Sequence, residues 1–182
     1  SIKPNLVRIF LFGTLISLGM QEHLRSNVLI FSFFTLLLAQ ICFEFKNKQI
    51  CCANFACLKL NHCVIADDAK ELIEKVRTAD VLCFATPIYY YAVSGQLKTF
   101  LDRMNPIYGV GHNFKDVYLL TAANDTDSKA MDGAIKDIEG WVECFEGVTL
   151  KGVVKGTGAN DVGDILSHKD KLEEAYNLGK NI

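Results

Sequence analysis

The fold of this chain is decided by residues 79–108, which read ADVLCFATPIYYYAVSGQLKTFLDRMNPIY. Within this stretch, the apolar run at residues 81–85 predicts a buried β-strand that leads directly into Thr86, Pro87 and three consecutive tyrosines. A helix is predicted next, because apolar residues recur there at helical spacing: Leu97, Phe100, Leu101 and Met104. In an open α/β sheet, ligands bind where strands end and helices begin. A rigid proline beside aromatic rings at that point suits a flat, aromatic ligand.

The rest of the chain repeats this alternation of strand and helix. Apolar runs predict four more strands, at residues 6–12, 41–45, 116–120 and 148–154. Apolar residues at helical spacing predict helices at residues 129–145 and 169–178, and a further helix after Asp68. Parallel strands need a crossover connection, which is usually a helix. We therefore expect one domain over residues 1–182, with a parallel sheet that helices cover on both faces.

Polar residues mark the ends of two predicted helices. Asp68 is followed three residues later by a glutamate, which is the spacing of a capping box. Ser94 is placed to cap the helix that follows it. Lys98 and Asp102 are four residues apart, so we expect an ion pair that supports the helix rather than catalysis. Asp102 and Arg103 together are expected to anchor this helix to a nearby loop.

Composition excludes some classes of function. The net charge is −2 and the chain has no basic patch, so nucleic-acid binding is not expected. The seven cysteines are an odd number without the regular spacing of a disulfide framework, and no secretory signal is evident. We therefore expect a cytoplasmic protein in a reducing environment.

Residues 28–39 read VLIFSFFTLLLA and are apolar around the whole circumference of a helix. Extended to residue 43, the run is still shorter than the roughly 20 residues that cross a membrane. It also starts too late for a signal peptide and lacks a small-residue cleavage site. We therefore expect no membrane span, with attachment to a membrane through residues 28–43 as the weaker alternative.

Four stretches of the chain resemble the NADPH-dependent FMN reductase family, a branch of the flavodoxin-like proteins. Residues 79–108 resemble its second flavin-contacting loop, and residues 46–69, KNKQICCANFACLKLNHCVIADDA, resemble its cysteine-bearing loop. Residues 117–123, VYLLTAA, resemble the next strand and its flavin-side loop. The tail, with GVVKGTGANDVGDI at residues 152–165, resembles one subgroup. The resemblance runs from residue 46 to the end of the chain and is absent from residues 1–45.

The resemblance implies a flavodoxin-like, three-layer α/β sandwich with a five-stranded parallel sheet of order 2-1-3-4-5. It implies FMN as the cofactor and NAD(P)H as the co-substrate. Hydride would pass from the nicotinamide to the flavin and then to a quinone, a nitro compound or another small-molecule electron acceptor. No catalytic acid or base is expected, because the cofactor carries the chemistry. The family also implies a homodimer or a larger homo-oligomer.

Candidate flavin-binding residues lie in three loops. Backbone N–H groups of residues 86–91 can bind the ring of the flavin, and a tyrosine can cover one of its faces; the alternative is a buried aromatic turn without a ligand. Small residues at 121–123 would let a ring approach the backbone; the alternative is an ordinary turn between strand and helix. The full set of candidates is Thr86, Pro87, Ile88, Tyr89, Tyr90, Tyr91, Thr121, Ala122, Ala123, Gly13 and Thr14.

Gly13 and Thr14 follow the first predicted strand, where the family places a phosphate loop with the approximate pattern Gly-Ser-x-Arg-x-x-Ser-x-Thr. Residues 12–31 read FGTLISLGMQEHLRSNVLIF. Gly13 and Thr14 stand at the right place without the following Ser, Arg and Thr, whereas residues 25–27, Arg-Ser-Asn, have suitable side chains but come too late in the sequence. Two alternative functions follow: a remnant that keeps the fold but binds FMN poorly, and an electron-carrier flavodoxin, which the small net charge disfavours.

The resemblance resumes abruptly at residue 46, although the preceding segment has the length of a strand, a helix and a second strand. A segment read out of frame would produce this pattern, and so would a divergent segment that packs on a partner subunit. We favour the frame explanation over divergence.

The cysteine-rich segment invites comparison with relatives that hold an iron–sulfur cluster through Cys-x-x-Cys-x-x-Cys and a fourth cysteine. The matching positions in this chain are Cys51, Asn54, Cys57 and Cys63, so one thiolate is missing. Because such a cluster needs four thiolates, we expect no metal here and interpret these residues as ordinary loop cysteines.

Overall fold

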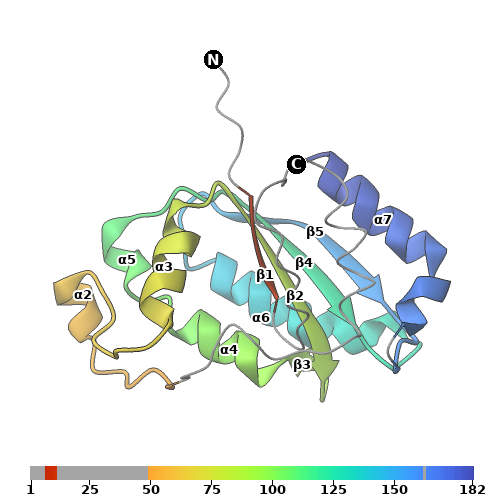
Figure 1. The fold of residues 1–182 in the computed structure, drawn as a ribbon, viewed down its shortest axis with the longest axis horizontal. Coiled ribbons are helices and arrows are strands. Elements are labelled where there is room, and N and C mark those ends of the chain that lie inside the picture. Colours follow the sequence, from red (N-terminus) through yellow and green to blue (C-terminus); the bar gives the residue numbers. More distant parts are fainter. Residues whose placement is uncertain (1–6, 12–48, 162) are drawn as a thin grey trace.

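The computed structural model describes residues 7–11, 49–161 and 163–182 (Figure 1). Their central sheet has four parallel strands in the order β1-β2-β4-β5. These strands are β1 (Val7–Leu11), β2 (Val81–Tyr89), β4 (Asp116–Ala122) and β5 (Thr149–Gly156). A two-residue strand, β3 (Ala92–Val93), turns back antiparallel to the end of β2.

The predicted strands at 6–12, 81–85, 116–120 and 148–154 are all formed, and they lie in the predicted relative order. The strand predicted at 41–45 lies outside the described residues. β2 continues beyond the predicted end at residue 85, because pairing with β3 keeps the chain extended as far as Tyr89.

Helices cover both faces of the sheet and give the three layers of the predicted α/β architecture (Figure 1). On one face, Leu82 and Phe84 of β2 pack with α3 (Ala69–Thr78), α4 (Gly95–Asp102) and α6 (Asp132–Val142). On the other face, Cys83 and Ala85 pack with α7 (Lys169–Lys180). The alternation of side chains along one strand therefore fills two separate cores.

The remaining helical elements are short. They are α2 (Ala56–Leu60), α5 (Ile107–Val110) and the 3₁₀ turns η1 (Ser128–Met131) and η2 (Asp164–Ser167). The helix predicted at 129–145 is divided between η1 and α6, which ends at Val142. The closing helix predicted at 169–178 is α7, two residues longer.

One predicted helix cap is correct and one is wrong. The Oγ of Ser94 accepts a hydrogen bond from the N–H of Leu97 at 3.3 Å, as predicted for the start of α4. The helix after Asp68 forms, but the Asp68 side chain makes no capping hydrogen bond. Instead, Oδ1 of Asp67 accepts the N–H of Ala69 at 3.1 Å, one residue earlier than the capping box requires.

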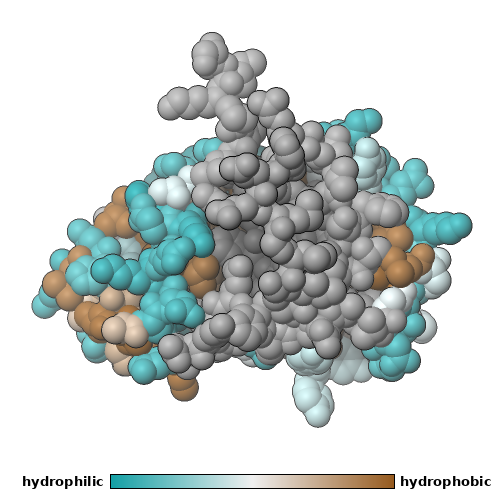
Figure 2. All heavy atoms as spheres, in the orientation of Figure 1, coloured by the Kyte–Doolittle hydropathy of each residue, from teal (hydrophilic) through white to brown (hydrophobic). Residues whose placement is uncertain are grey.

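Within the described ranges, no helix is long and apolar enough to cross a membrane, and residues 28–43 lie outside these ranges. Apolar side chains gather on the surface at the end of the molecule that holds α2 (Figure 2). The exposed apolar residues of this segment are Ile50, Phe55, Leu58, Leu60 and Val64.

Candidate functional site

The carboxyl ends of β2 and β4 bring two of the predicted flavin loops side by side. Thr86 is in register with Thr121, and Pro87 is in register with Ala122. At the same edge, β1 ends at Leu11, which pairs with Ala85 just before the aromatic loop. Gly13 and Thr14 lie outside the described residues.

The aromatic loop is a tight hairpin. Ile88 pairs with Val93 and Tyr89 with Ala92, so that Tyr90 and Tyr91 form the two-residue turn. Both turn residues have positive φ angles, 51° and 65°. Positive φ at both positions defines a type I′ turn, for which Asn-Gly is preferred. For residues with a side chain, the left-handed conformation costs about 1–2 kcal/mol each.

The three tyrosine rings are exposed rather than buried, with exposed fractions of 54% for Tyr89, 100% for Tyr90 and 64% for Tyr91. The alternative interpretation of residues 86–91 as a buried aromatic turn is therefore wrong for the tyrosines. A chain that places three neighbouring aromatic rings in solvent, two of them on strained backbone, offers a surface for stacking at this edge of the sheet.

The base of the hairpin is fixed by buried hydrogen bonds. The hydroxyl of Thr86 accepts the N–H of Ser94 at 3.0 Å and donates to the carbonyl of Pro87 at 2.9 Å. Ser94 in turn caps α4, and both residues are fully buried. The exposed turn is thus attached to a rigid base that includes the start of a helix.

The small-residue loop after β4 is equally well fixed. The Thr121 hydroxyl donates to the Val154 carbonyl of β5 at 3.0 Å. The N–H of Ala123 donates to the Gly156 carbonyl, and the Ala123 carbonyl accepts the N–H of Ala159, each at 2.8 Å. The loop also serves as an ordinary strand-to-helix connection, because Oδ1 of Asp127 caps η1 by accepting the N–H of Lys129.

Of the predicted anchor residues Asp102 and Arg103, only Arg103 joins the end of α4 to the cysteine-rich segment. Its guanidinium donates to both carboxylate oxygens of Asp67 at 2.7 and 2.8 Å, and to the Gln49 carbonyl at 2.7 Å. It also lies 3.1 Å from the Cys63 sulfur. Lys98 and Asp102 form the expected exposed ion pair at 2.6 Å and take no part in this anchor.

Both charges of the anchor are buried. Burial alone would raise the pKa of Asp67, but the hydrogen bonds from Arg103, from the Ala69 N–H and from the Gln49 N–H, together with the charge of Arg103, hold it below its usual value. The hydrogen bonds that Arg103 donates to Asp67 also raise the pKa of the Arg103 guanidinium. The pair is therefore ionised at neutral pH.

Six cysteines lie in the described part of the chain, and all are free thiols. Burial, with the neighbouring Cys63 and Cys51, raises the pKa of the Cys57 thiol, so these three sulfurs lie in one neighbourhood. The described residues contain no group of three or more His, Cys, Asp or Glu side chains arranged to hold a metal ion. Cys83 is a core residue of β2, and burial raises its pKa to about 12.

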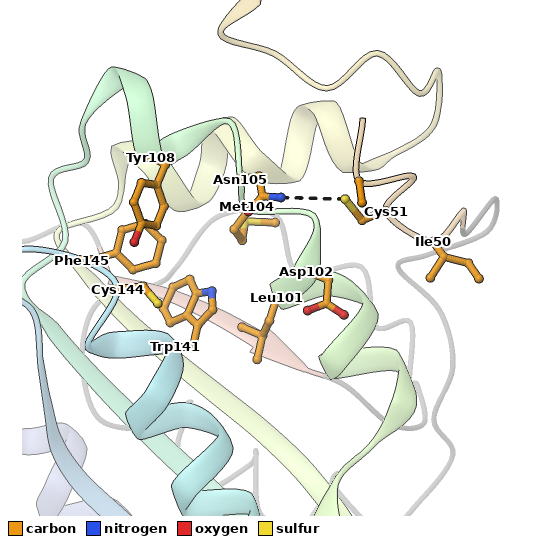
Figure 3. Close-up of a pocket in the computed structure, with 11 residues that line it drawn as sticks. Ile50, Cys51, Leu101, Asp102, Met104, Asn105, Tyr108, Trp141, Cys144 and Phe145 are labelled. Carbon is orange, nitrogen blue, oxygen red and sulfur yellow. Dashed lines mark hydrogen bonds between the residues drawn. The ribbon is translucent and has the colours of Figure 1, made fainter. Parts of the chain in front are cut away.

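A pocket, which the sequence did not indicate, lies between the cysteine-rich segment and the ends of α4 and α6 (Figure 3). Its volume is about 340 Å³. In Figure 3, the Tyr108 and Phe145 rings lie together on one side, and the Asn105 amide points to the Cys51 sulfur at 3.9 Å. The lining residues are Ile50, Cys51, Ala53, Leu101, Asp102, Met104, Asn105, Tyr108, Trp141, Cys144 and Phe145.

This pocket is separate from the strand-end edge. Trp141 in the last turn of α6 lines the pocket, whereas Gly133 in the first turn of α6 lies against the aromatic hairpin. Trp141 and Phe145 lie within the helix predicted at 129–145, and only the approach of the cysteine-rich segment shows that they also line a cavity.

The family model of the NADPH-dependent FMN reductases matches residues 18–148. The chain belongs to this family. The match begins earlier than the motifs indicated, because it includes part of residues 1–45, and it ends before the tail. The family reduces FMN with NADPH, so the predicted enzyme class and the predicted pair of FMN and NAD(P)H are those of the family.

Individual relatives agree with this assignment. YwqN of Bacillus subtilis, named as an NAD(P)H-dependent FMN-containing oxidoreductase, is 32% identical over 124 residues, which are 64% of this chain and 67% of the relative. An iron–sulfur flavoprotein of Archaeoglobus fulgidus is 31% identical over 143 residues, which are 75% of this chain and 60% of the relative. The chain thus spans about two thirds of the length of these two relatives.

Solved structures support the fold. The Trp repressor binding protein from Bacillus subtilis has a TM-score of 0.52 at 29% identity and covers 61% of this chain, with 75% of its own length aligned. The NAD(P)H:quinone oxidoreductase from Methanothermobacter marburgensis has a TM-score of 0.59 at 16% identity. That alignment covers 97% of this chain and 96% of the other and supports the α/β fold.

Proposed function

We propose that this chain is an FMN-dependent NAD(P)H oxidoreductase that binds its flavin at the carboxyl ends of β1, β2 and β4. The observation that carries the proposal is the exposed tyrosine hairpin at residues 88–93, which follows directly after Pro87, the partner of Ala122 in the small-residue loop. The family assignment supports FMN as the ligand, and the ends of the strands are where ligands bind in an open α/β sheet.

The residues at this edge fit a flavin ring. Ala122 and Ala123 have short side chains beside Pro87, so that a flat ring can approach the backbone there. The tyrosines at 89–91 supply exposed aromatic area for one face of the ring. We propose that the chain after β1, at Gly13 and Thr14, holds the phosphate end, because β1 lies next to β2 in the sheet.

When bound, the flavin supplies the hydride chemistry. The protein's part is to hold and orient the ring through Thr86, Pro87, Ile88 and the tyrosines, and to keep water from its covered face. We propose a quinone, a nitro compound or another small-molecule electron acceptor as the final substrate. An electron-carrier role is less favoured, because a net charge of −2 does not indicate a strongly acidic docking face.

Three further proposals concern the whole protein. Residues 41–45 would add a strand beside β1 and complete the sheet order 2-1-3-4-5. The chain would assemble as a homodimer or a larger homo-oligomer. The protein would be cytoplasmic, and the free cysteines of the described residues are compatible with that reducing environment.

The flavin site is tested by replacing two rings of the hairpin. Tyr89→Ala with Tyr90→Ala should weaken FMN binding by about 1–3 kcal/mol through lost stacking and apolar contact area. FMN titration followed by flavin fluorescence measures the affinity. Tyr108→Ala is the matched control, because Tyr108 is an exposed tyrosine that lines the other pocket.

Two results would contradict the proposal at different levels. If the wild-type protein bound no FMN, the oxidoreductase function itself would be wrong. If the double variant bound FMN as tightly as the wild type, the flavin would not use this hairpin.

A further inference from the structure

The first turn of α6 lies unusually close to the tip of the aromatic hairpin. A Cβ atom added to Gly133 would overlap the backbone carbonyl oxygen of Tyr91 and would lie 3.3 Å from its carbonyl carbon. Both overlapped atoms belong to the backbone, so no side chain can rotate away to make room. Glycine at position 133 is therefore required for this approach of helix and turn.

The same side of α6 contacts the hairpin at a second point. Asp137 lies four residues after Gly133, which places the two residues on one face of the helix. Its Oδ2 accepts the N–H of Val93 in β3 at 3.4 Å. Ile88, on the opposite strand of the hairpin, packs against a small cluster that contains Met131, the residue before α6, and Ile135 of α6 packs against the same cluster. The helix thus contacts the turn and β3, and it shares a cluster of apolar side chains with the other strand of the hairpin.

The contact with α6 supports the left-handed turn, which the tyrosine sequence itself does not favour. Tyr90 and Tyr91 adopt left-handed conformations without the glycine or asparagine that would favour them. Such conformations persist only where the surroundings determine them. The backbone of Tyr91 is held against α6, whereas the ring of Tyr90 is fully exposed and contributes no packing that could fix the turn.

We propose that α6 is the element that positions the flavin-side turn, and that Gly133 is a positioning residue whose missing side chain sets the place of the Tyr91 backbone. The proposal rests on the flavin site described above. A side chain at 133 would push the Tyr91 carbonyl away from the helix. The Tyr89–Tyr91 rings would then move relative to a flavin held by the neighbouring loop at 121–123, whose own hydrogen bonds do not involve α6.

The test compares two glycines of the same helix. Gly133→Ala and Gly140→Ala both raise helix propensity, but an added Cβ at Gly140 meets no atom within 4 Å. We expect Gly133→Ala to raise the Kd for FMN by about tenfold or more and to shift the absorbance spectrum of the bound flavin. We expect Gly140→Ala to bind FMN as the wild type does, with an unchanged spectrum.

A loss of fold is separated from a moved turn by circular dichroism and by hydrogen exchange of the Val93 amide. In a correctly folded Gly133→Ala protein, exchange should be faster at Val93 and unchanged in the central strands. If Gly133→Ala fails to fold, Asp137→Ala replaces it, since this variant removes the second contact without adding an atom, and a severalfold weaker binding of FMN is expected.

The outcomes distinguish this proposal from the function on which it rests. If the wild type binds FMN, and the folded Gly133→Ala or Asp137→Ala variants bind it equally well with an unchanged flavin spectrum, the positioning role is overturned and the flavin site stands. If the wild type binds no FMN, both proposals are overturned. Weaker binding by both Gly133→Ala and Gly140→Ala would also overturn the positioning role, because the effect would then not depend on the contact with Tyr91.

Discussion

At the scale of single residues, Arg103 shows how one side chain holds a distant segment in place. It is one of the few charged residues buried in the described part of the chain, and it joins α4 to Asp67 and Gln49. Removing the partner of a buried charge destabilises a protein far more than removing the partner of an exposed charge. The anchor is therefore a point at which a single substitution should have a large effect on stability.

We expect Arg103→Met to lower the free energy of unfolding by about 3–5 kcal/mol, because it leaves the Asp67 carboxylate buried without its ion pair. Urea unfolding, followed by the fluorescence of Trp141, measures this change. Lys98→Met, which breaks the exposed pair with Asp102, is the control and should cost less than about 1 kcal/mol. Equal costs for the two variants would show that the Arg103 pair is not desolvated in solution.

The sequence indicated some of these residues but not their partners. An anchor was predicted at Asp102 and Arg103, and only Arg103 forms it. Its partner Asp67 lies 36 residues away, and nothing local identifies it. The contact between Gly133 and Tyr91 could not be predicted for the same reason, since a glycine in a predicted helix does not indicate which distant residue packs against it. Local spacing predicts which face a residue occupies but not which distant atom it meets.

At the scale of elements, strands and helices with strong periodicity were predictable and short elements were not. The apolar runs gave β2, β4 and β5, and the helical spacing gave α4 and α7. β3 has only two residues, too few to show a pattern, and its pairing lengthens β2. The structure therefore has a hairpin at residues 88–93, where the sequence predicted only a loop.

The cysteine-rich segment leads to a prediction about metal binding. Asn54 occupies the place of one thiolate in the set Cys51, Cys57 and Cys63, so after anaerobic reconstitution with iron and sulfide the wild type should not retain stoichiometric iron. Asn54→Cys completes the four thiolates and should retain more iron. Iron analysis after gel filtration measures both, and Cys52→Ser in the Asn54→Cys background should not change the result.

The opposite result would change the interpretation of the segment. Stoichiometric iron in the wild type that is lost in Cys57→Ser would make this chain an iron–sulfur flavoprotein, like the Archaeoglobus fulgidus relative. Asn54 or Cys52 would then have to act as the missing ligand.

At the scale of the whole molecule, the alternation of strands and helices predicted the layers and the order of the four described strands. That residues 1–182 form one domain stays a prediction, and so does the strand at 41–45. The pocket at Trp141 could not be predicted, because three separate parts of the chain line it. A pocket of this kind depends on how separate elements pack together, so the sequence of each element alone shows no pattern that predicts it.

The first 45 residues give a prediction about the natural protein. We expect mass spectrometry of the natural protein to find no peptides that match residues 26–46 as written, because a change of reading frame explains why the motifs begin abruptly at residue 46. The family match from residue 18 includes part of this stretch as written, which counts against the frame explanation and makes the test decisive. Peptides with the sequence as written would rule out the frame explanation and favour a divergent segment that packs on a partner subunit.

The tyrosine turn has a consequence for anyone who redesigns this chain. A design procedure that ranks sequences by folding stability would write Asn-Gly at positions 90 and 91, because that pair suits a type I′ turn. Helix propensity alone would also replace Gly133 by alanine. Both choices improve a local score and remove the aromatic surface or its support. A stabilised library should therefore keep positions 90, 91 and 133 fixed, because it would otherwise lose the surface that we propose for the flavin.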